Sequence, residues 1–239
     1  MSIMQLNITP AIYMGKWDDI HQMGLAARTE RDCQSFASCL RIICYTHYCG
    51  NCRQHATAYM EKYPPESYFA NCFYYTVAFH NNVNARLGKR VIDYQLATAW
   101  YTNINGLRPP HFESRTVYVG KWNDIHTIAA YADLSNGNMM VDYEWAVNVI
   151  CSTLPNAEYS HNCMLWLREN PARAYFRDHQ CFLHSWKLHD YINNLANRPL
   201  NRRVSYDDAK RWYMAPRTHG CTAIPDRERP GILIMSCDK

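Results

Sequence analysis

Residues 15–21 read GKWDDIH and residues 120–126 read GKWNDIH, so six of these seven positions are identical. The correspondence continues in the same order along the chain. IIC ending at Cys44 matches VIC ending at Cys151, CGNC at 49–52 matches SHNC at 160–163, and Cys72 and Cys181 each precede a histidine, His80 or His189, by eight residues. Matches that keep one order with small offsets are typical of a tandem duplication. We therefore predict two copies of one domain of about 100 residues each.

The boundary between the two copies is predicted in NGLRPPHFESR, residues 105–115, because glycine and paired prolines break helices. Each copy ends on a tryptophan, Trp100 or Trp212. The stretch APRTHGCTAIPDRERPG that follows Trp212 is rich in proline, glycine and arginine and is predicted to be irregular. The expected division is a first domain at residues 1–108, a second at 109–215 and an irregular tail at 216–239.

The hydrophobic pattern of the first copy is helical. Apolar residues recur at helical spacing between residues 32 and 45, and a second helix is expected from Gly50 until Pro64 and Pro65 end it. Ser67 is a candidate cap for a long helix that Gly88 closes, and a short last helix is expected to hold Trp100. The fold class is therefore all-α, with four or five helices in each copy and no strand.

Charge and hydropathy limit the partners that the chain is expected to have. The formal charge of +4 and the isoelectric point near 8.4 are mild, and the charged residues are spread along the chain. We expect no nucleic acid and no membrane surface as a partner. No apolar run reaches the roughly 18–20 residues that span a bilayer, and the first residues lack a charged leader and an apolar core. A soluble protein without a cleaved signal is the expectation.

Eleven cysteines in such a chain indicate metal or redox chemistry rather than an extracellular disulfide scaffold. Cys49 and Cys52 have the spacing of zinc ligands, but the sequence contains no second C-x-x-C that would complete a structural site. No metal is therefore predicted, although zinc stays an alternative. Thioredoxin-like chemistry is another alternative, but it requires strands around the motif, and SFASCLRIICYTHY before Cys49 has a helical pattern.

The C-x-x-C is expected at the first turn of a helix. The free backbone N–H groups and the partial positive charge of a helix start favour a thiolate over a thiol. Cys49 would then be the better nucleophile, while Cys52, one turn further in, would face the bundle. This asymmetry suits dithiol exchange, in which one sulfur meets outside partners and the other closes the disulfide.

The ordered set of motifs resembles the Erv/ALR family of flavin-linked sulfhydryl oxidases. It consists of Trp17-x-x-x-His21, the C-x-x-C-R-x-H of residues 49–55, the string HNNVNARLGK at 80–89, and Trp100. The C-R-x-H form is similar to quiescin-type and large-DNA-virus members. The resemblance covers the first copy and implies a small helical bundle that holds FAD. It also implies a reaction in which electrons pass from a substrate dithiol through the C-x-x-C to FAD and then to O2, giving a disulfide and hydrogen peroxide.

The resemblance also implies the roles of individual residues. Cys49 would exchange electrons with the substrate and Cys52 would lie next to the flavin. The implied FAD-binding residues are Gly15, Trp17, His21, Tyr45, Cys52, His55, His80, Asn81, Val83, Asn84, Leu87, Lys89 and Trp100. Each of these residues has an ordinary structural interpretation when taken alone, as a core aromatic, a buried histidine or a cap. The order of the whole set favours the cofactor site.

The second copy keeps Trp122, His126, His189 and Trp212 but has Ser160 where the first cysteine of a C-x-x-C is expected. It is predicted to be a degenerate copy that pairs with the first as an internal pseudo-dimer, with a homodimer as a further arrangement. Candidate shuttle cysteines are Cys221 with Cys237 and Cys33 with Cys39.

The sequence thus predicts an enzyme, an FAD-dependent thiol oxidase that acts on protein thiols and molecular oxygen. By its similarity to viral members, it would act in the cytoplasm or in association with the virion. The alternative is a redox-silent structural or virion-assembly protein that retains the helical bundle.

Overall fold

A computed structural model of the chain describes residues 9–47, 49–103, 115–135, 138–197, 203–214, 221–225 and 233–237. The body is helical, as predicted. The first half contains α1 (Thr9–Ala26), α2 (Glu30–Tyr45), α3 (Gly50–Lys62), the 3-10 turn η1 (Pro65–Tyr68), α4 (Cys72–Arg86) and α5 (Tyr94–Tyr101). The second half contains α6 (Arg115–Leu134), α7 (Asn138–Ser152), α8 (Ala157–Glu169), the 3-10 turn η3 (Ala172–Tyr175), α9 (Cys181–Leu195) and α10 (Tyr206–Met214).

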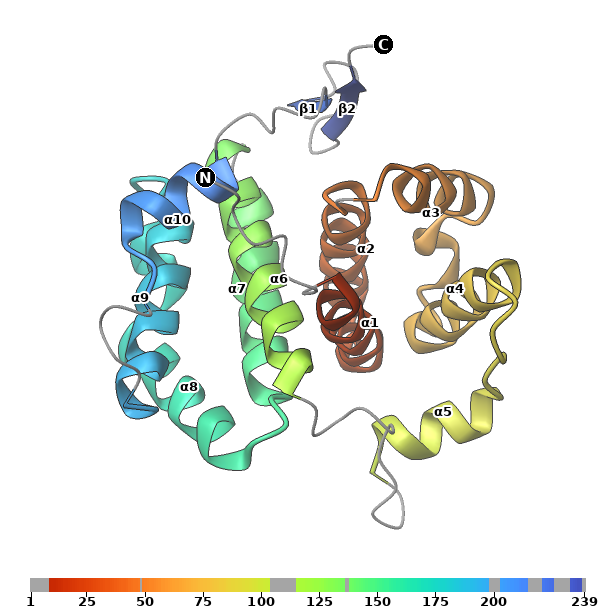
Figure 1. Cartoon of the computed structure of the whole chain (residues 1–239), viewed down its shortest axis with the longest axis horizontal. Coiled ribbons are helices and arrows are strands. Elements are labelled where there is room, and N and C mark those ends of the chain that lie inside the picture. The colour runs from red at the N-terminus through yellow and green to blue at the C-terminus, as the bar shows by residue number, and fades with distance from the viewer. Residues whose placement is uncertain are drawn as a thin grey trace.

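The helices form two groups that meet along their first two members. Helix α1 packs against α6, and α2 packs against α7, so these four helices form the centre of the molecule (Figure 1). Helices α3, α4 and α5 lie on the outer side of α1 and α2, while α8, α9 and α10 lie on the outer side of α6 and α7 (Figure 1). One continuous apolar core runs through both groups.

Short polar residues set where the helices begin. The Thr29 hydroxyl accepts a hydrogen bond from the Asp32 N–H at 3.1 Å, and the Asp32 carboxylate accepts one from the Thr29 N–H at 3.0 Å, which is a complete capping box. The predicted cap at Ser67 is wrong. Residues 65–68 form a 3-10 turn after the proline pair, and Asn71 caps α4 by accepting the Tyr74 N–H at 2.8 Å.

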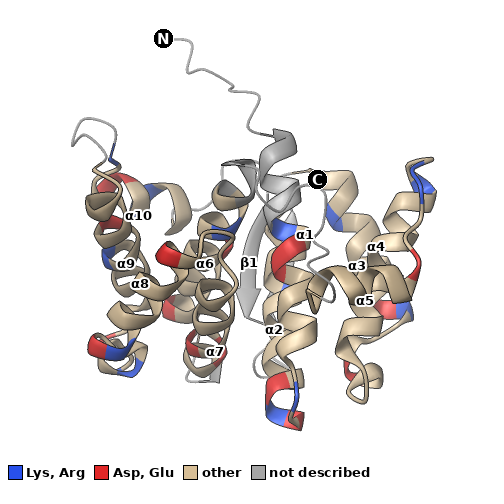
Figure 2. Cartoon of the chain, turned by 90° about the horizontal axis from the view of Figure 1, so that it is seen from below, with Lys and Arg blue, Asp and Glu red and all other residues tan. Residues whose placement is uncertain are grey.

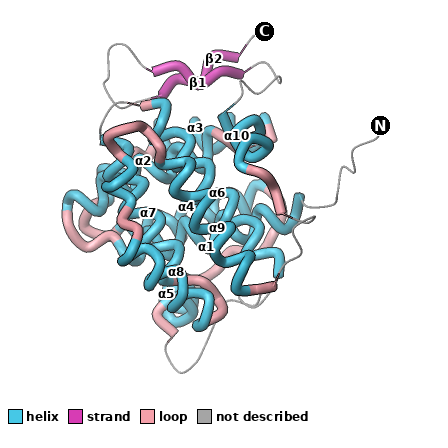
Figure 3. Tube along the Cα trace, turned by 90° about the vertical axis from the view of Figure 1, so that its left-hand side faces the viewer, coloured by secondary structure: helices cyan, strands magenta, loops and turns pink. Residues whose placement is uncertain are grey.

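The tail that was predicted to be irregular contains a two-stranded antiparallel hairpin, which Figure 3 draws in magenta. It consists of β1 (Cys221–Pro225) and β2 (Leu233–Cys237), and its register places Cys221 opposite Cys237. The sequence ILIMSC, residues 232–237, is apolar enough for a strand, and the proline-rich and glycine-rich residues before it obscured this signal. These are the only strands among the described residues.

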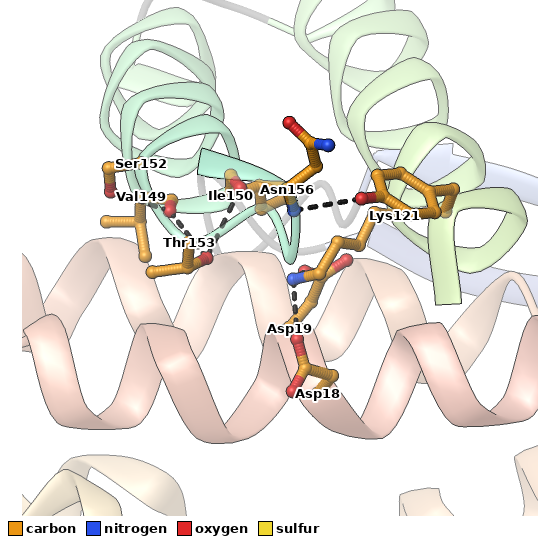
Figure 4. Close-up of polar contacts among 9 residues, drawn as sticks. Asp18, Asp19, Lys121, Val149, Ile150, Ser152, Thr153 and Asn156 are labelled. Atoms are coloured by element: carbon orange, nitrogen blue, oxygen red, sulfur yellow. Dashed lines mark hydrogen bonds and ion pairs between the residues drawn. The ribbon is translucent and has the colours of Figure 1, made fainter. Parts of the chain in front are cut away.

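Five charged residues are buried where α1 crosses α6. Lys121 binds Asp18 and Asp19, each at 2.6 Å, and none of these three side chains is exposed to solvent (Figure 4). Lys16 of α1 in turn binds Asp124 of α6. Lys16 and Asp19 in the first heptapeptide correspond to Lys121 and Asp124 in the second, so each lysine binds the aspartate of the other segment. The contact is therefore reciprocal, as in a twofold interface.

The cluster holds three carboxyl groups but only two lysines. Burial raises the pKa of Asp19 well above its ordinary value, and the attraction of Lys121 offsets this only in part. One oxygen of Asp19, one of Asp124 and Oδ1 of Asp18 are buried without a hydrogen-bond donor among the described residues, and the side chains of Asp19 and Asp124 interact. A single proton shared by Asp19 and Asp124 would give that pair a donor and make the cluster electrically neutral.

A second polar contact joins α2 to α7. The Ser35 hydroxyl donates to the Asp142 carboxylate at 2.7 Å, and Arg31 binds the same oxygen at 2.8 Å. Ser35 precedes Cys44 by the same number of residues as Asp142 precedes Cys151, so the two residues have corresponding positions in the two halves. The inner helices thus meet through matched positions in the ionic cluster and in the contact between Ser35 and Asp142.

Charged residues of both signs occur along the described helices. Lysine and arginine are interspersed with aspartate and glutamate in both groups of helices (Figure 2). None of the described helices has both the length and the apolar composition required to cross a bilayer. The described residues also contain no group of three or more His, Cys, Asp or Glu side chains that could hold a metal ion.

Replacing Lys121 with methionine should lower the free energy of unfolding by about 3–5 kcal/mol, because it leaves Asp18 and Asp19 buried without their cation. Urea denaturation measures this change. The matched control is Arg173→Ala, which removes an ion pair with Glu144 on a side chain that is 74% exposed and should change the free energy of unfolding far less. Equal effects of the two substitutions would contradict the role assigned to the buried cluster.

The raised pKa of Asp19 predicts a pH dependence of stability. The folded chain binds this proton more tightly than the unfolded chain, in which an aspartate has a pKa of about 3.9. The free energy of unfolding should therefore fall as pH rises from about 4 toward the raised pKa. Asp19→Asn, which resembles the neutral acid, should reduce this slope. Asp93→Asn should leave it unchanged, since residue 93 is exposed and asparagine also caps α5. An undiminished slope in Asp19→Asn would rule out this proton.

Candidate functional site

Cys49 is the N-cap of α3, as the sequence predicted. Its sulfur accepts a hydrogen bond from the Cys52 backbone N–H at 3.3 Å, and its own carbonyl accepts the Arg53 N–H at 3.0 Å. The sulfur therefore lies at the positive end of the α3 dipole and accepts a backbone N–H, an environment that stabilises a thiolate. Cys49 and Cys52 are both half-buried, so the expected shielding of Cys52 is not pronounced.

His47 holds the turn that precedes the C-x-x-C, a role that the sequence analysis missed. Its Nδ1 accepts the Cys49 backbone N–H at 3.2 Å, and its carbonyl accepts a hydrogen bond from Arg53 at 2.6 Å. Burial, with the nearby positive charges of Lys16 and Arg53, lowers the pKa of His47 to about 3. The ring is therefore neutral above that pH and keeps the lone pair that accepts the Cys49 N–H.

Three rings from α1 and α4 form the centre of the predicted cofactor region. Trp17 lies parallel to His80, with ring centroids 4.0 Å apart and an interplanar angle of 3°. His21 bonds to His80 at 2.9 Å through Nε2 and to the Thr76 hydroxyl at 2.8 Å through Nδ1. Both histidines thus have fixed orientations, and α1 contributes two of the three rings.

A glycine allows α1 to approach α4 closely enough for these contacts. A Cβ atom on Gly24 would lie 2.6 Å from Cγ2 of Thr76 and 3.1 Å from the carbonyl oxygen of Cys72. Both distances are shorter than normal carbon contacts. Since Gly24 follows His21 by three residues on the same helix, the glycine keeps His21 within reach of Thr76.

A small cavity of about 20 Å³ lies beside the rings, between α1, α4 and α5. Its lining includes His21, His80, Asn81, Trp100 and Tyr101, of which four were predicted as cofactor-binding residues. The walls are mostly apolar and aromatic, with two histidines, and the space is about that of one water molecule. The sequence analysis missed Tyr101, which lies next to the predicted Trp100.

Asn81 has a structural task beside this cavity. Its amide nitrogen donates to the Ile92 carbonyl at 2.7 Å, and its amide oxygen accepts the Ile92 N–H at 2.8 Å. The amide is thus occupied by the connection between α4 and α5, and it places Ile92 in the cavity wall.

The remaining predicted residues are spread over four elements. Gly15 belongs to α1, half-buried Tyr45 ends α2, and exposed His55 lies on α3. The rest lie on or just after α4: Val83 is half-buried, Asn84 is buried, and Leu87 and Lys89 are exposed. Near Lys89 the chain turns at Gly88, whose φ is +65°, a conformation that glycine adopts without strain.

The second half repeats the contacts of the first. His126 bonds to the Ser185 hydroxyl and to His189, each at 2.9 Å, and Trp122 lies parallel to His189 at 4.1 Å and 2°. Ser185 and His189 correspond in sequence to Thr76 and His80. Burial is greater here, since Trp122 is 8% exposed and Cys163 is not exposed at all. Burial also lowers the pKa of His126 to about 3.

The candidate shuttle cysteines of α2 do not form a pair. The Cys33 thiol donates to the Phe69 carbonyl at 3.5 Å and also contacts Cys72, whereas the Cys39 thiol donates to the Asp142 carbonyl at 3.7 Å. The two thiols are buried against different parts of the molecule. This arrangement does not favour an exchange between them.

Comparison with known proteins finds similarity in the first half. The sequence profile of the Erv1 / Alr family matches residues 14–102. FAD-linked sulfhydryl oxidases of African swine fever virus isolates from Namibia, Kenya and Malawi are each 35% identical over 80 residues, which is 32% of this chain and 64% of each relative. The chain thus matches less than two thirds of the length of these curated relatives. No solved structure matches the chain significantly. The matched segment contains the C-x-x-C and every ring of the cavity.

Proposed function

We propose that this chain is an FAD-dependent thiol oxidase whose chemistry lies in its first half. The observation that carries the proposal is the half-buried Cys49–Cys52 pair at the start of α3, with the Cys49 sulfur bound to a backbone N–H at 3.3 Å. The pair belongs to a segment similar to the Erv1 / Alr family and to viral proteins named FAD-linked sulfhydryl oxidase. A redox-silent scaffold would not require a cysteine pair in this environment.

The residues of the first half fit FAD. Parallel rings of Trp17 and His80 offer flat faces against which adenine or isoalloxazine can stack, and the cavity walls beside them are mostly apolar. Trp100 and Tyr101 extend this wall from α5. Lys89 is exposed just after α4 and can meet a pyrophosphate as a point charge.

The cysteines carry out the exchange with the substrate. A substrate thiolate attacks the Cys49 sulfur of the Cys49–Cys52 disulfide, and the second substrate thiol then closes the substrate disulfide and releases Cys49 as a thiolate. The N–H of Cys52 and the start of α3 stabilise that thiolate. A bound FAD would supply the two-electron redox chemistry that links the reduced Cys49–Cys52 pair to the reduction of O2 to hydrogen peroxide. Cys221 and Cys237 are candidates for a pair that carries electrons from the substrate.

The second half acts as the partner of the first in an internal pseudo-dimer. Reciprocal bonds between Lys16 and Asp124 and between Lys121 and Asp19 support this arrangement, as does the repeated ring cluster around His126. A second copy without its own C-x-x-C would supply an interface within one chain rather than a second catalytic centre. Thiol-containing proteins of a viral particle, oxidised in the cytoplasm, are the proposed substrates because the named relatives are viral.

Cys52→Ser should abolish oxygen uptake with dithiothreitol while FAD stays bound, because the reduced pair can no longer form its disulfide. Oxygen electrode traces and the flavin absorbance of the purified variant measure the two effects. Cys163→Ser is the matched control in the second half and should retain most of the activity. Full turnover of Cys52→Ser would refute the mechanism, and a colourless protein reconstituted with FAD would favour the scaffold.

His47→Ala should lower turnover at least about tenfold, because the turn that presents Cys49 loses its acceptor and the reacting sulfur is less well positioned. FAD content should not change. His161→Ala is the control, since it removes an exposed histidine near the start of α8. Turnover of His47→Ala that equals the unmodified protein would show that the bond to the Cys49 N–H has no role in catalysis.

A further inference from the structure

A hydrogen-bond relay of four residues, Phe73, Thr76, His21 and His80, runs through the ring cluster of the first half. The Thr76 hydroxyl donates to the Phe73 carbonyl at 2.7 Å. The oxygen of this hydroxyl lies 2.8 Å from Nδ1 of His21, and Nε2 of His21 lies 2.9 Å from Nδ1 of His80. Thr76 and His21 are both buried, so water does not compete for the bond between them.

The direction of the first bond determines where the protons of the relay lie. A carbonyl oxygen can only accept, so the single hydroxyl proton of Thr76 points to Phe73. The hydroxyl oxygen must then accept a proton from Nδ1 of His21. A neutral imidazole has one N–H, so Nε2 of His21 is a lone pair and accepts from Nδ1 of His80. By the same rule, Nε2 of a neutral His80 is also a lone pair.

The second half contains the same relay with serine in place of threonine. The Ser185 hydroxyl donates to the Phe182 carbonyl at 2.8 Å and lies 2.9 Å from Nδ1 of His126, whose Nε2 lies 2.9 Å from Nδ1 of His189. Burial lowers the pKa of His126 to about 3, so this ring is neutral at neutral pH and has a single N–H. The feature common to the two relays is the hydroxyl group, since only one of them has the methyl group of a threonine.

We propose that Thr76 is a positioning residue of the cofactor site. Its hydroxyl sets the tautomer of His21, and His21 sets that of His80, so that His80 offers an Nε2 lone pair to a hydrogen-bond donor of FAD. His80 lines the cavity and lies parallel to Trp17. The role in binding rests on the proposed function, whereas the tautomers follow from contacts within the protein.

Removing the hydroxyl should reverse the relay. In Thr76→Val the side chain keeps its shape, but Nδ1–H of His21 would be buried without an acceptor, which is unfavourable. We expect His21 to carry its proton on Nε2 instead and to donate it to Nδ1 of His80. His80 then carries its own proton on Nε2, so that its acceptor becomes a donor although neither histidine has been replaced.

Nitrogen NMR of the full-length chain with 15N-labelled histidine measures these tautomers, because protonated and unprotonated ring nitrogens have different chemical shifts. His21→Gln and His80→Gln identify the two rings among the eleven histidines. Both rings should carry the proton on Nδ1 in the unmodified chain and in Thr76→Ser, and on Nε2 in Thr76→Val. Thr76→Ala removes the same hydroxyl with a smaller side chain and should give the same reversal. Ser185→Ala, the matched substitution in the second half, should leave His21 and His80 unchanged.

FAD affinity gives a second measurement. Thr76→Val should bind FAD at least about tenfold more weakly, since the donor of the cofactor meets another donor, whereas Thr76→Ser and Ser185→Ala should stay within about twofold of the unmodified chain. Proton positions that do not change in Thr76→Val and Thr76→Ala would overturn the relay. A reversed His80 with unchanged FAD affinity would overturn the role of Thr76 in binding. A relay that reverses as expected in a protein that takes up no FAD would count against the proposed function and leave the tautomers standing.

Discussion

Burial of opposite charges between α1 and α6 is the constraint on which the rest of the structure depends. Lys16 and Lys121 can lose their water only if each meets an aspartate of the other helix, and this requirement permits a narrow range of register between the helices. A shift of one residue would leave buried ions without partners. The apolar core stabilises the helical body, while the ionic cluster specifies how its two halves meet.

The register between α1 and α6 matters for the site because α1 contributes to both the ionic cluster and the ring cluster. Lys16 and Asp19 face α6, whereas Trp17 and His21 face α4, where they contact His80. The cavity also lies close to the buried charges. The pKa of Tyr101 is raised well above its ordinary value, mainly by burial and further by the negative charges of Asp18 and Asp19. A change at the interface would therefore move the rings on which a flat cofactor could stack.

Sequence patterns predicted the features that depend on neighbouring residues. The start of α3 at the C-x-x-C, the end of α3 before the proline pair and the short helix with Trp100 all follow from local rules of helix formation. The cap at Asn71 was missed because Ser67 satisfies the same rule, and only the 3-10 turn between them decides the outcome. The role of Thr76 depends on its contact with His21, which is distant in sequence, and no local pattern specifies it. In the bonds described, His47 contacts its neighbours Cys49 and Arg53, but the turn that brings them together follows no standard capping pattern.

Anaerobic reduction followed by oxygen tests the central claim most directly. The FAD-loaded chain is mixed with dithiothreitol in the absence of oxygen, and the flavin absorbance is recorded before and after air is admitted. The proposed function predicts that the band bleaches, that it returns with oxygen, and that each disulfide formed is matched by one hydrogen peroxide. A band that keeps its full intensity under dithiothreitol, in protein with bound FAD and intact Cys49 and Cys52, would contradict it.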